Sequence, residues 1–384
     1  MKTLFAISLL GILASAVHSQ DVRSYQHGVD FVQVAPDTYV VIWASSGFPP
    51  TGEDDDGEWS HDVYFSNINS SHPVLRPQML IEAPTAQEPA SAAATKNGNV
   101  MVTMEDAWRA ENVLRQSYAV YDQRMRPIRP YQSIVLDGGH SGHVAATDER
   151  FVVFYSEGWV DGGGVDNLGS GDDIWLKSYD SQGNPEFAQP VAVGNETRDW
   201  WPIAAGSTDR VLLLWQRFVA GQNHSRLLFH VYNPERNVWV TDEQVLAAKT
   251  AYYTYDVQYL DGLAAFLIVG VNDAGRGFAT LVSTQGKIIA QANQLPAFVR
   301  ESQPAIQTAR NGRVRVVYPT GENDLTVLEV STSQISYIKS IPVAVDWSIA
   351  GSDGIFTKDG GLFFLALSSA GVSSTKVSSE NLLK

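Results

Sequence analysis

Short apolar runs separated by polar turns recur along the chain at intervals of about 45 to 60 residues, a period typical of repeated strand units. In each unit a brief opening strand precedes a longer apolar strand, and a third strand ends in a turn. The opening strands begin near Val29, Pro89, His143, Pro202, Asp256, Pro304 and Ile349. The apolar second strands include residues 39–43, 100–104, 151–155, 211–215 and 314–318. The pattern predicts an all-β chain without intervening amphipathic helices.

Seven such units of four strands predict a seven-bladed β-propeller with antiparallel blades, formed by residues 20–384 as a single domain. The last unit, which begins at Ile349, offers only three strands. We expect residues 22–27 to supply the fourth strand and close the ring, which removes an exposed sheet edge. Residues that enter the first strands are expected to rim a central funnel: His27, Glu88, 140–143, 198–201, Tyr253, Glu301 and Asp346.

Residues 1–19 have the pattern of a signal peptide, with Lys2 before an apolar run and small residues near Ala16 and Ser19. The run is shorter than the roughly 20 apolar residues that a membrane span needs, and no later stretch approaches that length. We therefore expect a secreted protein without a membrane span. Glycosylation sequons begin at Asn69, Asn195 and Asn223.

The chain has no cysteine, so the fold depends on its apolar core and no thiolate chemistry is available. The formal net charge is −15, which argues against a nucleic-acid partner because phosphate binding needs a basic surface. The acidic surface is typical of a soluble secreted protein, and we expect a monomer.

Two connections, residues 45–62 and 156–173, are much longer than their counterparts in the last three units. Long loops in a compact domain are usually functional. The second contains Asp161, Asp166, Asp172 and Asp173, whose oxygens suit Ca²⁺, although aspartate and glycine are also common in ordinary turns. Calcium is therefore a candidate cofactor without the spacing of a known calcium loop.

The stretch Gly138-Gly-His-Ser-Gly-His143 places two histidines among glycines at the entry of the third unit. His140 and His143 are candidates for acid–base catalysis because the imidazole pKa lies near neutrality. The alternative is a structural pair that bonds to backbone carbonyls in a tight turn.

The fourth unit adds Arg198 and Arg217, whose planar guanidinium groups match a carboxylate or sulfate. Trp200 offers a flat face for a sugar ring, although a tryptophan here also suits the core between blades. Candidate sugar-binding residues at matching positions of the first three units are His61, Trp108, Arg109 and Trp159. Together these residues predict one functional face over the first four blades.

The blade pattern, the turn Tyr179-Asp-Ser-Gln-Gly-Asn-Pro185 and the acidic loops resemble secreted carbohydrate-active propellers. The histidine pair, Tyr155 and the arginines are similar to the residue types of propeller polysaccharide lyases such as ulvan and rhamnose–glucuronate lyases. The resemblance implies cleavage of a uronate-containing polysaccharide by β-elimination. It implies Arg198 or Arg217 at the carboxylate, His143 or His140 as the base and Tyr155 as the acid.

Two alternatives remain open. A hydrolase of sialidase-like architecture would use paired carboxylates, for which Glu105, Asp106 and Glu157 are available. A non-catalytic propeller that binds a glycan or a protein is the other. The net negative charge opposes a polyanionic substrate, so local arginines or a bound cation would have to outweigh it.

Overall fold

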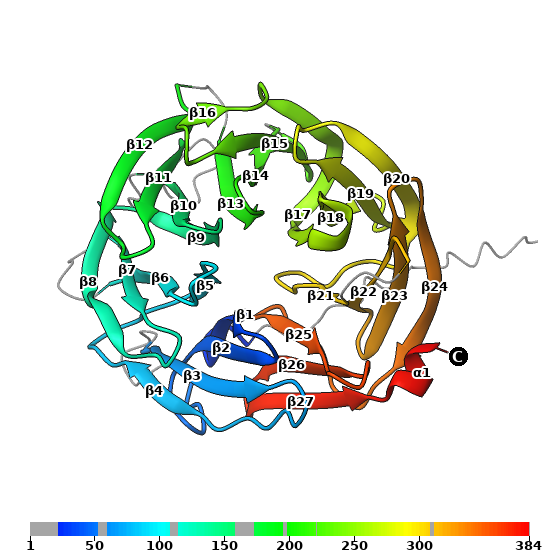
Figure 1. Cartoon of the computed structure of the whole chain (residues 1–384), viewed down its shortest axis with the longest axis horizontal. Helices are drawn as coiled ribbons and strands as arrows, with labels where there is room; N and C mark the ends of the chain where they lie inside the picture. The colour runs from blue at the N-terminus through cyan, green and yellow to red at the C-terminus, as the bar shows by residue number, and fades with distance from the viewer. Residues whose placement is uncertain are drawn as a thin grey trace, which may run out of the picture.

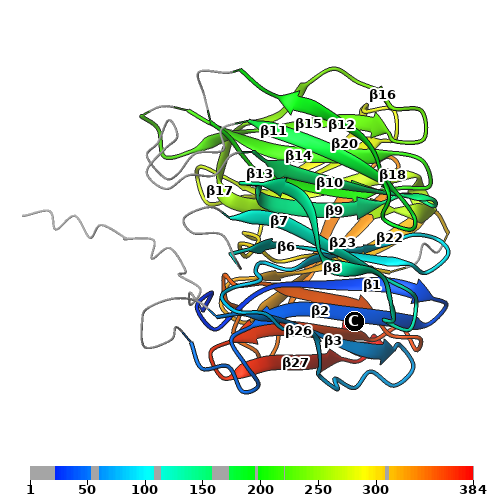
Figure 2. The ribbon, with the colours of Figure 1, turned by 90° about the vertical axis from the view of Figure 1, so that its left-hand side faces the viewer.

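The computed structural model describes residues 22–52, 60–107, 114–157, 173–194, 198–219, 221–307 and 311–383. They form antiparallel sheets that stand side by side around one axis, with the first strand of each sheet innermost (Figure 1). Seen from the side, the strands run across the thickness of the ring (Figure 2). The prediction of a nearly all-β chain of four-stranded antiparallel sheets is confirmed.

The first three sheets have four strands each. The first contains β1 (Gln26–Ala35), β2 (Thr38–Ser45), β3 (Asp62–Asn69) and β4 (Gln78–Ile81). The second contains β5 (Ser91–Ala94), β6 (Val100–Asp106), β7 (Arg115–Tyr121) and β8 (Pro127–Asp137). The third contains β9 (His140–Ala146), β10 (Arg150–Ser156), β11 (Ile174–Asp180) and β12 (Pro185–Ala192).

The next sheet has eight strands because one long strand, β17 (Gln244–Leu260), belongs to two neighbouring groups. Residues 244–250 of β17 pair with β15, and residues 255–260 pair with β18. The other strands are β13 (Asp199–Gly206), β14 (Val211–Phe218), β15 (Ser225–Asn233), β16 (Val238–Trp239), β18 (Ala265–Asn272), β19 (Gly277–Ser283) and β20 (Ile288–Leu295). A short 3₁₀ helix, η1 (Asp261–Leu263), follows β17.

Two sheets complete the ring. One contains β21 (Ala305–Ile306), β22 (Arg313–Thr320), β23 (Asp324–Ser331) and β24 (Ile335–Pro342). The other contains β25 (Ser352–Phe356), β26 (Leu362–Ser368) and β27 (Gly371–Val377), followed by helix α1 (Ser379–Leu383). Within the described residues, no helix is long and apolar enough to span a membrane.

The predicted fourth strand of the last sheet, residues 22–27, is not confirmed. Residues 23–25 form a turn, and Gln26 and His27 begin β1, which pairs with β2. The last sheet meets the first through packing and single hydrogen bonds instead. The Gly28 amide donates to the Ala350 carbonyl at 2.8 Å, and Val22 packs in one apolar cluster with Leu365. The predicted signal peptide, residues 1–19, lies outside the described residues.

The apolar core lies between neighbouring sheets. Val40 and Ile42 of β2, for example, share a buried cluster with Val100 and Val102 of β6. Because the second strand of a sheet is covered on both faces, its sequence is a continuous apolar run rather than an alternating one. The core therefore follows directly from the apolar runs that identify the repeats.

We expect Phe229→Ala to lower the free energy of unfolding by about 3 to 5 kcal/mol, because it empties a fully buried position between β15 and its neighbours. The matched variant Phe187→Ala removes the same side chain from an outer strand where it is 39% exposed, and should change stability far less. Urea denaturation of both variants measures the difference. Equal losses would contradict this placement of the core.

Candidate functional site

The innermost strands surround a cavity of about 400 Å³ on the ring axis. Residues of β1, β5, β9, β13 and β17 line it, together with residues 301–303. We call the end at which these strands begin the mouth; His27, His143, Trp201 and Glu301 line it there. These four residues were among those predicted to rim a funnel, and that part of the prediction is confirmed.

A buried histidine links three separate segments at the mouth. The Nδ1 atom of His27 pairs with Glu88 Oε2, and its Nε2 atom lies 2.8 Å from Glu301 Oε2. Burial alone would lower the pKa of His27, but the charges and hydrogen bonds of the two glutamates raise it to about 10. His27 is therefore a cation at neutral pH and donates from both ring nitrogens.

The two glutamates are ionised as a consequence. Burial by itself raises the pKa of Glu88 and of Glu301, but the charge and hydrogen bond of His27 outweigh burial and lower both values. Arg300 supports Glu301 through a 2.7 Å hydrogen bond from Nε to Oε1. The Arg300 guanidinium lies 4.4 Å from the centre of the Tyr253 ring and its side chain is 24% exposed. Arg300 is thus a partly exposed cation next to a residue that lines the cavity.

A second cluster lies beside this one, and in it the carboxyl group, rather than the histidine, carries the extra proton. Glu105 Oε1 accepts the Ser141 amide at 2.5 Å, and Glu105 Oε2 lies 3.2 Å from His140 Nε2. Burial, with a smaller effect from the charge of Glu88, raises the pKa of Glu105 to about 8. Burial, helped by the charges of Arg198 and His27, lowers the pKa of His140 to about 3. At neutral pH the carboxyl is protonated and the imidazole is neutral.

His140 contacts both Glu105 and Ser141 through its two ring nitrogens. His140 Nε2 faces the Glu105 carboxyl at 3.2 Å, and His140 Nδ1 forms a 2.6 Å hydrogen bond with Ser141 Oγ. The His140 ring stacks on Trp200 with ring centres 4.7 Å apart, and the Arg198 guanidinium lies 3.7 Å from the centre of Trp200. The structure therefore brings His140, Trp200 and Arg198 together as the sequence suggested.

His143 occupies the cavity wall itself. Its Nδ1–H donates to the Ser141 carbonyl at 3.2 Å, and burial lowers the pKa of the ring, so His143 is neutral at neutral pH. The ring meets Trp201 edge to face at 5.6 Å, and Trp201 meets Tyr253 in the same way at 5.3 Å. Aromatic rings thus pack in series from His143 through Trp201 to Tyr253, and the first two line the cavity.

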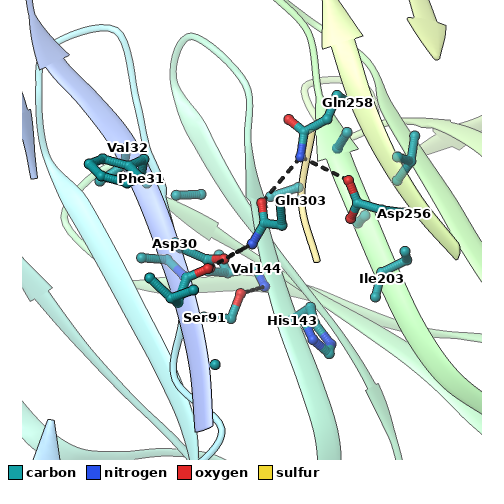
Figure 3. A pocket seen from close by; sticks show the side chains of 18 of the residues that line it. Asp30, Phe31, Val32, Ser91, His143, Val144, Ile203, Asp256, Gln258 and Gln303 are labelled. Atoms are coloured by element: carbon teal, nitrogen blue, oxygen red, sulfur yellow. Dashed lines mark hydrogen bonds between the residues drawn. The ribbon is translucent and has the colours of Figure 1, made fainter. Parts of the chain in front are cut away.

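Below the mouth the cavity is lined by hydrogen-bond acceptors (Figure 3). The Gln303 amide donates to Asp30, and Gln258 Nε2 lies within hydrogen-bonding distance of both Gln303 Oε1, at 3.2 Å, and Asp256 Oδ2, at 3.0 Å. Burial raises the pKa of Asp30 to about 6 and that of Asp256 to about 8. No lysine or arginine is among the described residues that line the cavity. This inner part disfavours an anionic group.

Of the five predicted catalytic residues, His143 lines the cavity, and His140, Arg198, Arg217 and Tyr155 do not. Arg217 donates from Nε to Asp199 at 2.7 Å, and its two terminal nitrogens each donate to Glu243 at 2.9 Å. Tyr155 is 4% exposed in the cluster between the second and third sheets, where burial raises its pKa to about 12. The prediction that Arg217 points into the funnel and the placement of Tyr155 as a catalytic acid are both wrong.

The other predicted site residues either are buried or hydrogen-bonded within the fold, or lie outside the described residues. His61 is fully buried beside Glu88, and burial lowers its pKa. Asp106 is buried and accepts hydrogen bonds from Tyr131 and Ser117, and Asp173 accepts one from the Gly194 amide. Residues outside the described ranges are Trp108, Arg109, Trp159, Asp161, Asp166 and Asp172. Glu157 lies near Asp173, and burial raises the pKa of this glutamate.

The sequence placed His27, Glu88, Tyr253 and Glu301 near the funnel but assigned none of them a role. Their position before a first strand was the available signal. Their pairing was not, because His27 is separated from Glu88 by 61 residues and from Glu301 by 274 residues.

Comparisons with known proteins bear on the fold. No family model matches the chain, and no curated protein matches it. Among solved structures, the polysaccharide lyase Uly1 is 9% identical, with a TM-score of 0.54 over 97% of this chain and 94% of that one. A PL25 ulvan lyase bound to -[GlcA(1-4)Rha3S]- is 11% identical, with a TM-score of 0.52 over 93% of this chain and 95% of that one.

A chain from a mitotic checkpoint complex matches equally well, with 11% identity and a TM-score of 0.52 over 98% of this chain and 99% of that one. The architecture therefore includes proteins of unrelated function, and identities this low establish the fold alone. The resemblance to propeller polysaccharide lyases is confirmed as one of architecture.

We expect His27→Gln to destabilise the protein by about 3 to 5 kcal/mol near pH 6, because it leaves two buried carboxylates without their cation. The folded pKa of His27 lies above its ordinary value of 6.5, so its stabilisation is complete below pH 6.5 and is lost as the pH rises to about 10. It is also lost in acid, as the pH falls through the lowered pKa values of Glu88 and Glu301.

Urea midpoints of the wild type and variant from pH 4 to 10 measure this difference. The exposed His72, changed to Gln, is the matched control and should give a difference near zero throughout. A His27 effect that grows above pH 8 would contradict the assignment.

Proposed function

We propose that the chain is a carbohydrate-active enzyme that cleaves a uronate-containing polysaccharide by β-elimination at the mouth of the central cavity. The observation that carries the proposal is the pairing of neutral imidazoles with a protonated carboxyl in one place. β-Elimination needs an unprotonated base to take a proton and a protonated acid to give one at the same pH. His143 and His140 supply the first and Glu105 the second.

The roles follow from position. His143, on the cavity wall, takes the C5 proton of the uronate; the electron pair forms the C4–C5 double bond and the C4–O4 bond breaks. The Glu105–His140 pair returns a proton to the leaving oxygen. Arg300, which is partly exposed next to Glu301, neutralises the uronate carboxylate and so increases the acidity of the C5 proton. Arg198 is 1% exposed and lies against the Trp200 ring, so it contributes positive charge to the site without contacting the substrate.

Local charge supports an anionic substrate despite the net charge of −15. The positive charges of Arg23 and Arg300 act on Glu301, and the positive charge of Arg198 acts on His140. Beyond about 8 Å at physiological salt the remaining charges are largely screened. The mouth can therefore attract a carboxylate that the protein as a whole repels.

The proposal also covers the number of blades, secretion, a calcium ion and the residues that contact the sugar. We propose that the two halves of the eight-stranded sheet act as separate blades, which gives seven, and that residues 1–19 direct a monomer to secretion. Calcium in the loop that ends at Asp173 remains part of the proposal as a structural cofactor. The sugar stacks on Trp201 and Tyr253 at the mouth.

One observation favours a second candidate, a glycoside hydrolase. Glu105 is protonated and Glu88 is ionised at neutral pH, and the two interact electrostatically. Carboxyl groups whose pKa values are pushed apart are the arrangement that glycosidases use for acid and base. A hydrolase would release reducing ends without forming a double bond.

A panel of uronate-containing and neutral polysaccharides distinguishes the candidates. Ultraviolet absorbance detects the unsaturated product of elimination, and a reducing-end assay detects either cleavage. We expect both signals from a uronate polymer, and a loss of at least about 100-fold in His143→Ala and Glu105→Gln. His72→Ala, at an exposed site, should keep full activity. Reducing ends without absorbance would favour hydrolysis, and neither signal would favour a binding protein.

The pH profile provides a separate test. Glu105 gives a proton only while protonated, so kcat should fall as the pH rises above about 8. His143 must be neutral, and its lowered pKa places the acid limb below its ordinary value of 6.5. Initial rates from pH 4 to 10 should show this plateau, and the alkaline limb should vanish in the residual activity of Glu105→Gln. A wild-type rate that still rises between pH 8 and 10 would contradict Glu105 as the acid.

A further inference from the structure

A second hollow lies on the outer wall of the ring, where β20 and β24 run next to each other (Figure 1). It is a hollow of about 640 Å³ that is open to solvent. Its polar lining consists of Arg276, Gln291, Asn293, Gln294, Gln334 and Tyr337. No aspartate or glutamate is among the described residues that line it. We call this hollow the outer groove.

An exposed aromatic ring forms part of the outer groove. Tyr337 of β24 is 48% exposed, although its strand neighbour across the sheet is the buried Leu328. The Tyr337 hydroxyl lies 3.3 Å from Ser340 Oγ, which helps to orient the ring. A fixed aromatic face that remains in water is suited to the apolar C–H side of a pyranose, because contact removes apolar surface from water at little entropic cost.

The polar side chains around Tyr337 are positioned by the backbone. Gln294 has a φ of 64° and is the extra residue of a bulge between the pairs Gly277–Leu295 and Phe278–Asn293. A bulge redirects the side chain of the bulged strand. Gln291 donates from Nε2 to Thr280 Oγ1 at 3.4 Å, which leaves its carbonyl oxygen as an acceptor. Carboxamides so held can bond to sugar hydroxyls.

Arg276 gives the outer groove a positive charge. It lies in the turn between β18 and β19, where its backbone amide donates to Asn272 Oδ1 at 3.0 Å. Within the described part of the chain its guanidinium makes no ion pair, and its side chain is exposed. An unpaired arginine in a groove lined by no acid favours an anionic ligand.

We propose that the outer groove is a second, non-catalytic glycan-binding site that holds an acidic polysaccharide on the wall of the ring. Tyr337 stacks on one sugar, the carboxamides bond to its hydroxyls and Arg276 pairs with a carboxylate. The ligand class rests on the proposed function, whereas the position of the site does not. Binding here raises the local concentration of polymer near the mouth and should matter for long chains but not for short ones.

Affinity electrophoresis of the full-length protein tests the proposal with each polymer of the activity panel, in a His143→Ala background that prevents cleavage. We expect an acidic polymer to retard this protein and a neutral dextran to leave it unretarded. Adding Tyr337→Ala and Arg276→Ala should weaken the interaction by about tenfold, the loss expected when aromatic and arginine anchors are removed. Phe187→Ala removes an aromatic ring that is 39% exposed on another outer strand and should have no effect.

The outcomes separate this site from the proposed activity. With His143 intact, the two groove substitutions should raise KM for the polymer and leave turnover of short oligosaccharides unchanged. Retardation that the groove substitutions leave unchanged, or no retardation by any acidic polymer, would overturn the proposal. If no unsaturated product forms but retardation is seen and is lost with Tyr337 and Arg276, the proposed activity fails and the outer groove stands.

Discussion

The interaction on which the site depends is the buried ion pair of His27 with Glu88 and Glu301. Burial is the main cause of the altered pKa values of the neighbouring groups, and the charges of this ion pair add to it. The negative charge of Glu88 helps to raise the pKa of Glu105, and the positive charge of His27 helps to lower the pKa of His140. Burial and a paired set of charges thus lie side by side at the mouth, an arrangement that separates the pKa values of nearby groups.

The same interaction joins the start of the first sheet to the segments that lead into β5 of the second sheet and into β21. Buried ion pairs contribute little net stability because desolvation offsets their attraction, so the apolar cluster shared by the first and last sheets must provide most of the energy of closure. The ion pair instead fixes the relative positions of the segments that it joins. It fixes the entry of β1 against segments 61 and 274 residues away, and so aligns strand starts from distant parts of the chain around one mouth.

The fold could be predicted from the sequence because each second strand is a continuous apolar run. The residues at the mouth could be predicted because the first strands of all sheets begin at the same end of a propeller. Tyr155 could also have been placed correctly. It shares the face of β10 with Phe151 and Val153, and all three pack in one cluster, as period-two alternation implies. Arg217 could not, because its partner Glu243 follows 26 residues later, just before β17, and only the fold brings them together. Pairing between charged residues that are distant in sequence decides which charges remain available, and strand patterns do not encode it.

Charge and polarity also change with depth, and this gradient orients a ligand. Arginine charges act on groups at the mouth, whereas the inner cavity presents Asp30, Asp256 and carboxamides without a lysine or arginine among its described lining. A carboxylate therefore gains at the mouth and loses if it descends, while uncharged hydroxyls can donate to the acceptors below. A uronate held at the mouth would thus keep its carboxylate at Arg300 and direct its hydroxyl groups inward. Selectivity for a uronate would then come from the unfavourable inner environment as much as from the favourable outer one, because discrimination depends on the difference between the two.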